Sequence, residues 1–582
     1  MNNSNNWHLK ILEIDLTNCI SKEVILPDEI YSLYIGARGL GVYLFCKYYF
    51  ANPQWYPLVI SVGPLTGSGA PGGVCFTLTT KSTLTGGINT VAGRGNWGVE
   101  LAWSGYDALV ITGKAKEPVY IDITCKGVEV KSAFHLWGKT TSEILDYSNK
   151  ENKQALFIST AGENRLPLAT LVSGGDLLIQ GGGIGRVWGE KYLKAIFVRG
   201  EAPRKLSKLE EIKKELVGIY TLLNKNPVNT RGLGVFGDVG FLQWFALKKV
   251  LPIKNFSLSF TPDALFLSGE ALYKEFTLYP HSCYACPINC QHHLYFQGRK
   301  VVAPSYTVVS ALGLNPCIFS WHYLIAIYEE CIEQGIDPVS WGATLSLAMR
   351  ISELGLARIL FWGKGESALE LTKKLKEYKH FSYPLHLGSK ELARHFNLFE
   401  ELFQIRPGVD LVGLQPWAGA GYFLSLFTSP YGGGWLSSFI EAIELMGIPK
   451  RVSRFSPATR AGILSLWENF STAVDALGLC RYLQFSLNLE QINKLLNVFT
   501  GEKFQPAQLL LVGERIWNLE TVVNYYLQVK IKVSEPVSIK NLFTHFNISY
   551  PIEEMWMAYC KFRGWQEEGL GSRKKLLELG LL

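Results

Sequence analysis

The sequence is poor in charged residues and contains no long apolar run. Asp, Glu, Lys and Arg make up 18% of its 582 residues, against about 25% in a typical soluble protein. No stretch approaches the roughly 18 consecutive apolar residues that a membrane-spanning helix needs, so we expect no membrane span. The first residues also lack the basic-then-apolar order of a secretory signal, and we expect a cytoplasmic protein.

Blocks of like charge, internal repeats and low-complexity tracts are also missing. Lys and Arg total 57 and Asp and Glu total 50, which gives a net charge of +7, but the basic residues are scattered. Without a basic cluster the sequence does not predict nucleic-acid binding. Apolar residues make up 48% of the chain, and together with the low charge they favour a large core and surface hidden in a cofactor cavity or an interface.

The chain changes character near residue 207. Residues 1–207 alternate glycine-rich turns with short β-rich runs, at 58–63, 74–80, 108–113, 119–124 and 194–200. Helical periodicity begins at 208 and continues in segments such as 320–335, 340–355 and 457–478, with a loop-rich break around 405–435. We therefore predict an α+β chain with a sheet-rich domain (1–207) and two mainly α-helical domains (208–410 and 411–582).

Three of the eleven cysteines lie within eight residues, as Cys283, Cys286 and Cys290. This C-x2-C-x3-C run suits metal binding in a reducing compartment better than a disulfide framework. It would supply three ligands of a cubane iron–sulfur cluster, with the fourth from elsewhere in the chain, for which Cys480 is the candidate. A zinc site completed by His292 or His293 and an unmetallated loop are the alternatives.

Glycine-rich segments recur at 36–41, 63–69, 92–95, 181–185 and 231–234. Successive backbone N–H groups in such turns form concave anion sites, and the missing side chains let a flat or phosphorylated cofactor approach. The segment at 36–41 lacks the strand before it and the acidic residue after it that dinucleotide binding requires, and no segment is a P-loop. Each could be an ordinary turn, but the set as a whole favours a cofactor cavity.

Together these motifs resemble the tungsten-dependent aldehyde ferredoxin oxidoreductase family along the whole chain. The resemblance is carried by GARGLG (36–41), SVGPLTGSGAPG (61–72), TAGEN (160–164), LPIKNF (251–256), SCYACPINC (282–290) and DALGLC (475–480). It implies that the first domain is a base of two sheets for the cofactor and that the two helical domains close over it.

The cofactors that the resemblance implies are a tungsten (or molybdenum) bis-pterin and one 4Fe-4S cluster held by Cys283, Cys286, Cys290 and Cys480. The implied reaction is oxidation of an aldehyde to a carboxylic acid, with electrons leaving through the cluster to ferredoxin or a small iron–sulfur subunit; a homodimer is also implied. Asp475 would accept hydrogen bonds from pterin N–H groups. The full set of implied cofactor-binding residues is Arg38, Gly39, Cys75, Ala92, Gly93, Arg94, Gly182, Gly183, Asp337, Asp475 and Leu479.

Several positions depart from the family pattern. Ser305 stands where the family has a glutamate, and Trp435 where it has an active-site histidine, so both acid–base groups are replaced. Cys75 replaces an arginine that bridges pterin and cluster, and we expect the fixed positive charge there to be lost. Tyr306 is a candidate proton donor and Cys317 a candidate tungsten ligand; a packed aromatic ring and a structural thiol are the alternatives.

These departures fit two functions. The first is an active oxidoreductase for an aldehyde or another oxo or acyl substrate, which turns over common aldehydes poorly because its usual proton acceptors are gone. The second is a catalytically degenerate paralogue that serves as an electron relay or structural subunit of a redox complex.

Overall fold

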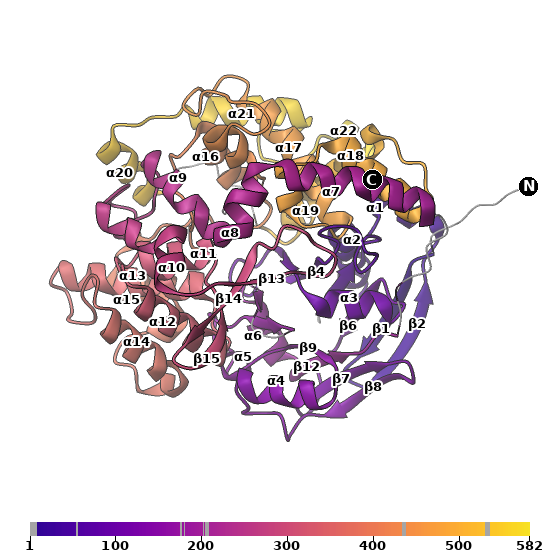
Figure 1. Ribbon diagram of the computed structural model, residues 1–582, viewed down its shortest axis with the longest axis horizontal. Coiled ribbons are helices and arrows are strands. Elements are labelled where there is room, and N and C mark those ends of the chain that lie inside the picture. Colours follow the sequence, from indigo (N-terminus) through magenta and orange to yellow (C-terminus); the bar gives the residue numbers. More distant parts are fainter. Residues whose placement is uncertain are drawn as a thin grey trace, which may run out of the picture.

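The computed structural model describes residues 8–53, 56–174, 177–179, 181–201, 203, 209–432, 438–529 and 536–582. Figure 1 shows the strands of the first 200 residues gathered on one side of the molecule, with the helices of the central and C-terminal parts on the other. No helix within these ranges is long and apolar enough to cross a membrane.

The N-terminal part contains two mixed sheets of six strands each. The first has the order β2-β1-β6-β3-β4-β5, with β1 parallel to β6, and the second has the order β11-β10-β9-β12-β7-β8, with β12 parallel to β7. The strands are β1 (Lys10–Asp15), β2 (Ile20–Ile25), β3 (Leu58–Val62), β4 (Phe76–Lys81), β5 (Ile88–Gly93), β6 (Ala108–Thr112), β7 (Val119–Thr124), β8 (Gly127–Ser132), β9 (Gln154–Phe157), β10 (Leu171–Ser173), β11 (Leu177–Ile179) and β12 (Leu193–Val198).

Both faces of the central strands are covered, which explains their almost uninterrupted apolar sequence. Side chains such as Ile60 of β3 and Ile196 of β12 share one core between the sheets. Trp97 links the sheets directly, because its indole N–H donates to the carbonyl of Ile196 at 3.0 Å. The structure thus confirms the two-sheet base that was expected for the first domain.

The rest of the chain is mainly helical and adds one small antiparallel sheet, β13 (Tyr279–His281), β14 (Gln291–Phe296) and β15 (Arg299–Val302). The helices of the N-terminal part are α1 (Asp28–Tyr34), α2 (Ala37–Ala51), α3 (Asn96–Trp103), α4 (Thr141–Lys150), α5 (Thr160–Glu163) and α6 (Ile184–Glu190). Those that follow are α7 (Leu209–Lys225), α8 (Gly234–Phe236), α9 (Phe241–Leu247), α10 (Gly269–Glu275), α11 (Tyr306–Val308), α12 (Trp321–Gln334), α13 (Pro338–Glu353), α14 (Gly365–Lys373), α15 (Ser389–Phe396), α16 (Ala420–Thr428), α17 (Arg460–Ala476), α18 (Leu489–Thr500), α19 (Pro506–Tyr526), α20 (Val537–Phe546), α21 (Ile552–Arg563) and α22 (Arg573–Glu578).

Local sequence explains where the predicted helices begin and end. Helix α12 stops at Gly335, whose φ of 71° places it in the left-handed region that favours glycine. Helix α13 begins directly afterwards, because Asp337 caps its N-terminus by accepting from the N–H of Val339 and Pro338 occupies the first turn.

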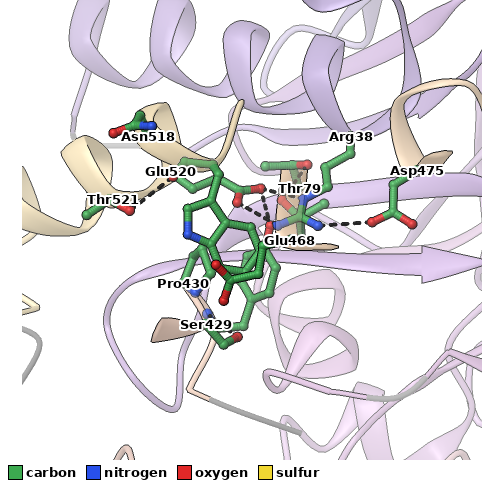
Figure 2. Close-up of polar contacts among 12 residues, drawn as sticks. Arg38, Thr79, Ser429, Pro430, Glu468, Asp475, Asn518, Glu520 and Thr521 are labelled. Carbon is green, nitrogen blue, oxygen red and sulfur yellow. Dashed lines mark hydrogen bonds and ion pairs between the residues drawn. The ribbon is translucent and has the colours of Figure 1, made fainter. Parts of the chain in front are cut away.

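A buried ion cluster joins the N-terminal part to the C-terminal helices (Figure 2). Arg38 of α2 donates two hydrogen bonds to the carboxylate of Glu520 on α19, at 2.9 and 2.7 Å, and a third to Asp475 on α17 at 3.0 Å. The three side chains are at most 7% exposed. The rings of Tyr431 and Trp517 lie 5.2 and 5.3 Å from the guanidinium carbon, which adds cation–π attraction.

We expect Arg38→Met to lower the midpoint of thermal unfolding clearly. The variant leaves Glu520 buried without its counter-charge, and breaking a buried ion pair in this way costs about 3–5 kcal/mol. The matched control is Lys139→Met, which removes an exposed ion pair with Glu143 whose contribution is about 0–1 kcal/mol. Differential scanning calorimetry of the two variants makes the comparison, and equal midpoints would contradict the structural role of Arg38.

Candidate functional site

The cavity that most of the predicted cofactor-binding residues line, which we call the main cavity, lies where the edge strand β5 meets the C-terminal helices. Its volume is about 450 Å³, and its walls come from residues 88–94, 181–182 and 479–482, with Arg38 of α2, Asp475 of α17 and Trp517 of α19. Three of the predicted glycine-rich turns contribute to it: 36–41 through Arg38, 92–95 through Ala92, Gly93 and Arg94, and 181–185 through Gly181 and Gly182. Segments far apart in the sequence therefore converge on one cavity.

One wall of this cavity has room for backbone only. Gly181 and Gly182 have φ values of 113° and 68°, and a Cβ on Gly182 would lie 2.0 Å from Nδ2 of Asn89. That Nδ2 is buried and has no hydrogen-bond partner within the described ranges. A buried donor without a partner costs about 1–3 kcal/mol, so a bound group with an acceptor atom here would be stabilised. This wall suits a flat polar ring such as a pterin.

Two predicted cofactor-binding glycines adjoin the cavity but do not line it. Gly39 packs α2 against the preceding segment, because a Cβ there would lie 2.2 Å from the carbonyl oxygen of Tyr34. Gly183 precedes α6 with a φ of 70°. Both allow close packing beside the cavity, against the Tyr34 backbone at Gly39 and against the Thr83 side chain at Gly183.

Asp475 lines the cavity with its carboxylate largely engaged. Arg481 donates to Oδ1 at 2.8 Å and to Oδ2 at 2.5 Å, and Arg38 donates to Oδ2 as well. Burial opposes its ionisation, but the Arg481 and Arg38 guanidinium groups outweigh this effect and lower the pKa of Asp475. Since each carboxylate oxygen can accept two hydrogen bonds, one acceptor position remains on Oδ1 for a donor in the cavity.

The three clustered cysteines lie in the turn between β13 and β14, and Cys480 lies beside them. Gly72 connects the two groups: its carbonyl accepts from the N–H of Cys480 at 2.9 Å, and its own N–H donates to the sulfur of Cys286. The N–H of Cys286 in turn donates to the carbonyl of Cys283 at 3.1 Å. All four thiols are free, and the thiols of Cys283, Cys286 and Cys290 each interact electrostatically with Cys480.

No group of three or more His, Cys, Asp or Glu side chains in the described part of the chain is arranged to hold a single metal ion. The chemistry of the four soft sulfur donors suits an iron–sulfur cluster.

A fifth cysteine, Cys75, lies beside Cys480 and lines the main cavity. Its thiol donates to the sulfur of Cys480, and this hydrogen bond lowers the pKa of Cys480 despite burial. Two hydrogen bonds of its backbone fix its position. Its N–H donates to the carbonyl of Gly478 at 3.1 Å, and its carbonyl accepts from the hydroxyl of Thr66 at 2.7 Å. Cys75 therefore contacts both the cavity and one of the four clustered thiols.

That Cys75 removes a fixed positive charge stays a prediction, but Arg94, directly after β5, places another guanidinium beside the cavity and the cysteines. Burial disfavours its charged form, but Cys290, Tyr482 and Cys283 surround it and raise its pKa. Arg94 lines both the main cavity and a smaller one next to it.

The smaller cavity, which we call the side cavity, has a volume of about 80 Å³ and shares Arg94, Leu178 and Tyr482 with the main cavity. Its other lining residues include Asp238, Cys290, His292 and Ser305. Ser305, directly before α11, lines the side cavity and not the main cavity.

Asp238, which sequence reasoning missed, is the carboxylate of the side cavity. Its Oδ1 accepts from the N–H of Tyr306 at 2.9 Å and its Oδ2 from the hydroxyl of Tyr482 at 2.8 Å. Burial raises its pKa, against the opposing effects of the Tyr306 N–H and the Arg94 charge. A single aspartate in a glycine-rich segment carries no sequence signal for this position.

The remaining predicted residues lie away from the two cavities or outside the described ranges. Tyr306 is fully buried, and its hydroxyl donates to the carbonyl of Gly413 at 2.6 Å, as a packed aromatic would. Cys317 lines neither cavity; burial raises its pKa to about 11 and the N–H of Lys254 donates to it.

Asp337 accepts from the N–H of Gly181, behind the cavity wall, and burial raises its pKa to about 6. Trp435 lies outside the described residues.

The sequence of the chain matches one family of known proteins. Residues 11–200 match the model of the aldehyde ferredoxin oxidoreductase N-terminal domain, and residues 215–581 match that of its domains 2 and 3. Tungsten-containing aldehyde ferredoxin oxidoreductases of Pyrococcus furiosus and Pyrococcus abyssi are 31% and 30% identical, with 99% and 98% of both chains covered.

A solved structure shares the fold at lower sequence identity. It is the active site complex BamBC of benzoyl coenzyme A reductase in complex with 1,5-dienoyl-CoA, with a TM-score of 0.83, 21% identity and coverage of 99% of this chain and 98% of that one. The fold, the cavity and the matches over both parts of the sequence agree, and the chain belongs to the aldehyde ferredoxin oxidoreductase family.

Proposed function

We propose that the chain is an oxidoreductase with a tungsten (or molybdenum) bis-pterin in the main cavity and one 4Fe-4S cluster on Cys283, Cys286, Cys290 and Cys480. The observation that carries this proposal is the continuity of the two sites: Cys75, Cys480 and Arg94 border the cavity and the cysteine cluster at once. A group in the cavity and a cluster on the thiols would then be close enough for direct electron transfer.

The residues of the cavity would hold and orient the cofactor. Asn89, the 181–182 turn and the free position on Asp475 offer hydrogen bonds to a polar ring, and Arg94 and Arg481 offer positive charge to an anionic group. The bound metal would supply the two-electron chemistry, while the protein supplies position and a low-dielectric surrounding.

The substrate of this proposal is an aldehyde or another oxo or acyl compound, and the electron partner is ferredoxin or a small iron–sulfur subunit. The two Pyrococcus relatives, which are aldehyde ferredoxin oxidoreductases, support an aldehyde as the substrate and ferredoxin as the partner. A degenerate relay or structural subunit is the second candidate, because Ser305 leaves the side cavity without a carboxylate at that position.

We expect anaerobically purified protein to contain iron, tungsten or molybdenum, and pterin together. Cys480→Ser should lower the iron content below about four atoms per chain and change the cluster spectra, since one of the four thiolate ligands is lost. Cys125→Ser, at an exposed free cysteine, is the control and should retain full iron. Metal analysis and the visible and EPR spectra measure the outcome; zinc in place of iron would contradict the cluster.

The backbone wall of the cavity gives a second test. Gly182→Ala should lower pterin content, because the added Cβ would collide with Asn89 at a positive φ. Gly105→Ala is matched to it, since Gly105 also has a positive φ, of 87°, but has nothing within 4 Å of its Cβ position. Equal pterin in the two variants would show that this wall does not hold the cofactor.

Activity separates the enzyme from the degenerate paralogue. We expect slow reduction of a viologen dye with small aliphatic and aromatic aldehydes, and a gain in the Ser305→Glu, Trp435→His double variant, because a general base contributes about 10²- to 10⁴-fold. Fully loaded protein with no turnover in either form would favour the relay or structural subunit. Fast wild-type turnover that the double variant leaves unchanged would contradict the assignment of these two positions.

A further inference from the structure

The side cavity contains a carboxylate that the sequence pattern alone does not reveal. Asp238 comes from the short helical turn Gly237–Gly240, far in sequence from both Ser305 and Tyr482. It lies in the same small cavity as Ser305 and is bonded to the N–H of the next residue, Tyr306, at 2.9 Å. The cavity thus holds a carboxylate in space although residue 305 supplies none.

Tyr482 connects this carboxylate to the main cavity. The residue lines both cavities, and its hydroxyl donates to Oδ2 of Asp238 at 2.8 Å. A hydroxyl can accept one proton on its oxygen while it passes its own proton on, so Tyr482 can relay a proton without forming a phenolate. The hydrogen bond already points in the direction that transfer toward Asp238 requires.

The surroundings keep the carboxylate buried but able to change charge. Arg94, Tyr306 and Tyr482 interact with it directly, and Cys290, His292 and Tyr328 also line the side cavity. The Arg94 guanidinium is the cation among these groups, and no ion pair ties Arg94 to a carboxylate within the described ranges. The positive charge of Arg94 therefore attracts Asp238 across the cavity without forming a salt bridge. Protonation of Asp238 does not have to break a salt bridge.

We propose that Asp238, acting through Tyr482, is the proton acceptor of this site, and that it is a less direct acceptor than the acid–base residues missing at 305 and 435 because the proton must pass the Tyr482 hydroxyl first. The inference rests on the proposed function. An aldehyde and water give a carboxylic acid, two protons and two electrons: the aldehyde C–H bond and one water O–H bond break, and a C–O bond forms. The electrons leave one at a time to ferredoxin or a viologen dye, one proton passes through Tyr482 to Asp238, and the other passes to bulk water.

The first test is Asp238→Asn in protein with verified iron, tungsten or molybdenum, and pterin. The amide keeps the size of the carboxyl and can still accept from the N–H of Tyr306, so the fold is retained while the proton acceptor is lost. We expect viologen reduction with aldehyde to fall by about 10²- to 10⁴-fold. The rising limb of kcat/KM with pH should also disappear, because the acceptor must be ionised and its raised pKa sets that limb.

A spectroscopic readout separates proton acceptance from a purely structural role. When aldehyde reduces the enzyme that contains its metal, iron and pterin, the infrared difference spectrum should show a C=O band of a protonated carboxyl group. The Asp238→Asn variant should lack this band. The control is Asp410→Asn: burial raises the pKa of Asp410 to about 6, but this residue bonds Ser389 and Gln404 and lines neither cavity. This variant should keep the band.

Rescue completes the test. In the Asp238→Asn background, Ser305→Glu restores a carboxylate to the same cavity and should recover activity, whereas Ser305→Gln should not. If the Asp238→Asn variant contains its metal, iron and pterin but keeps the turnover, the pH profile and the carboxyl band of the wild type, the proposed role of Asp238 is wrong. The proposed function would still stand. Protein that purifies without pterin and metal would instead overturn the proposed function, so the two failures are distinct.

Discussion

The site depends on one buried arginine. Arg38 stands near the start of the chain, and its partners Asp475 and Glu520 follow 437 and 482 residues later. Because all three charges are buried, separating them is costly, and this cost favours the arrangement of the N-terminal sheets and the last helices in which they pair. That arrangement sets the main cavity, since Arg38 and Asp475 are part of its wall.

Local patterns made much of the fold predictable. Apolar runs such as 108–113 and 194–200 gave strands because both sheet faces are covered, and the helix at 320–335 ended at a glycine in the left-handed conformation. The cysteine and glycine motifs were also visible, because their chemistry lies within a few residues. The role of Asp238 was not visible, since its bond to Tyr482 spans 244 positions and depends on how the domains pack.

Arg94 also shows why the charges of the site could not be predicted from single sequence positions. Position by position, the replacement of an arginine by Cys75 predicted a missing charge. The structure places a different guanidinium at the border between cavity and cysteines, from the end of strand β5. Electrostatic energy depends on where a charge lies in space and not on which residue carries it. Substitutions at single aligned positions therefore misjudge a site whose groups can be supplied from neighbouring strands.

The contacts of Gly72 bear on the order in which the site can form during protein synthesis. This glycine holds Cys286 on one side and Cys480 on the other, and the cavity is closed by residues 475–482 and Trp517. During synthesis, Cys283, Cys286 and Cys290 and the cavity residues of the first 182 positions are made well before residues 475–482 and Trp517. The proposed cofactors would have a complete site only once residues 475–482 and Trp517 have been synthesised and packed against the first part of the chain.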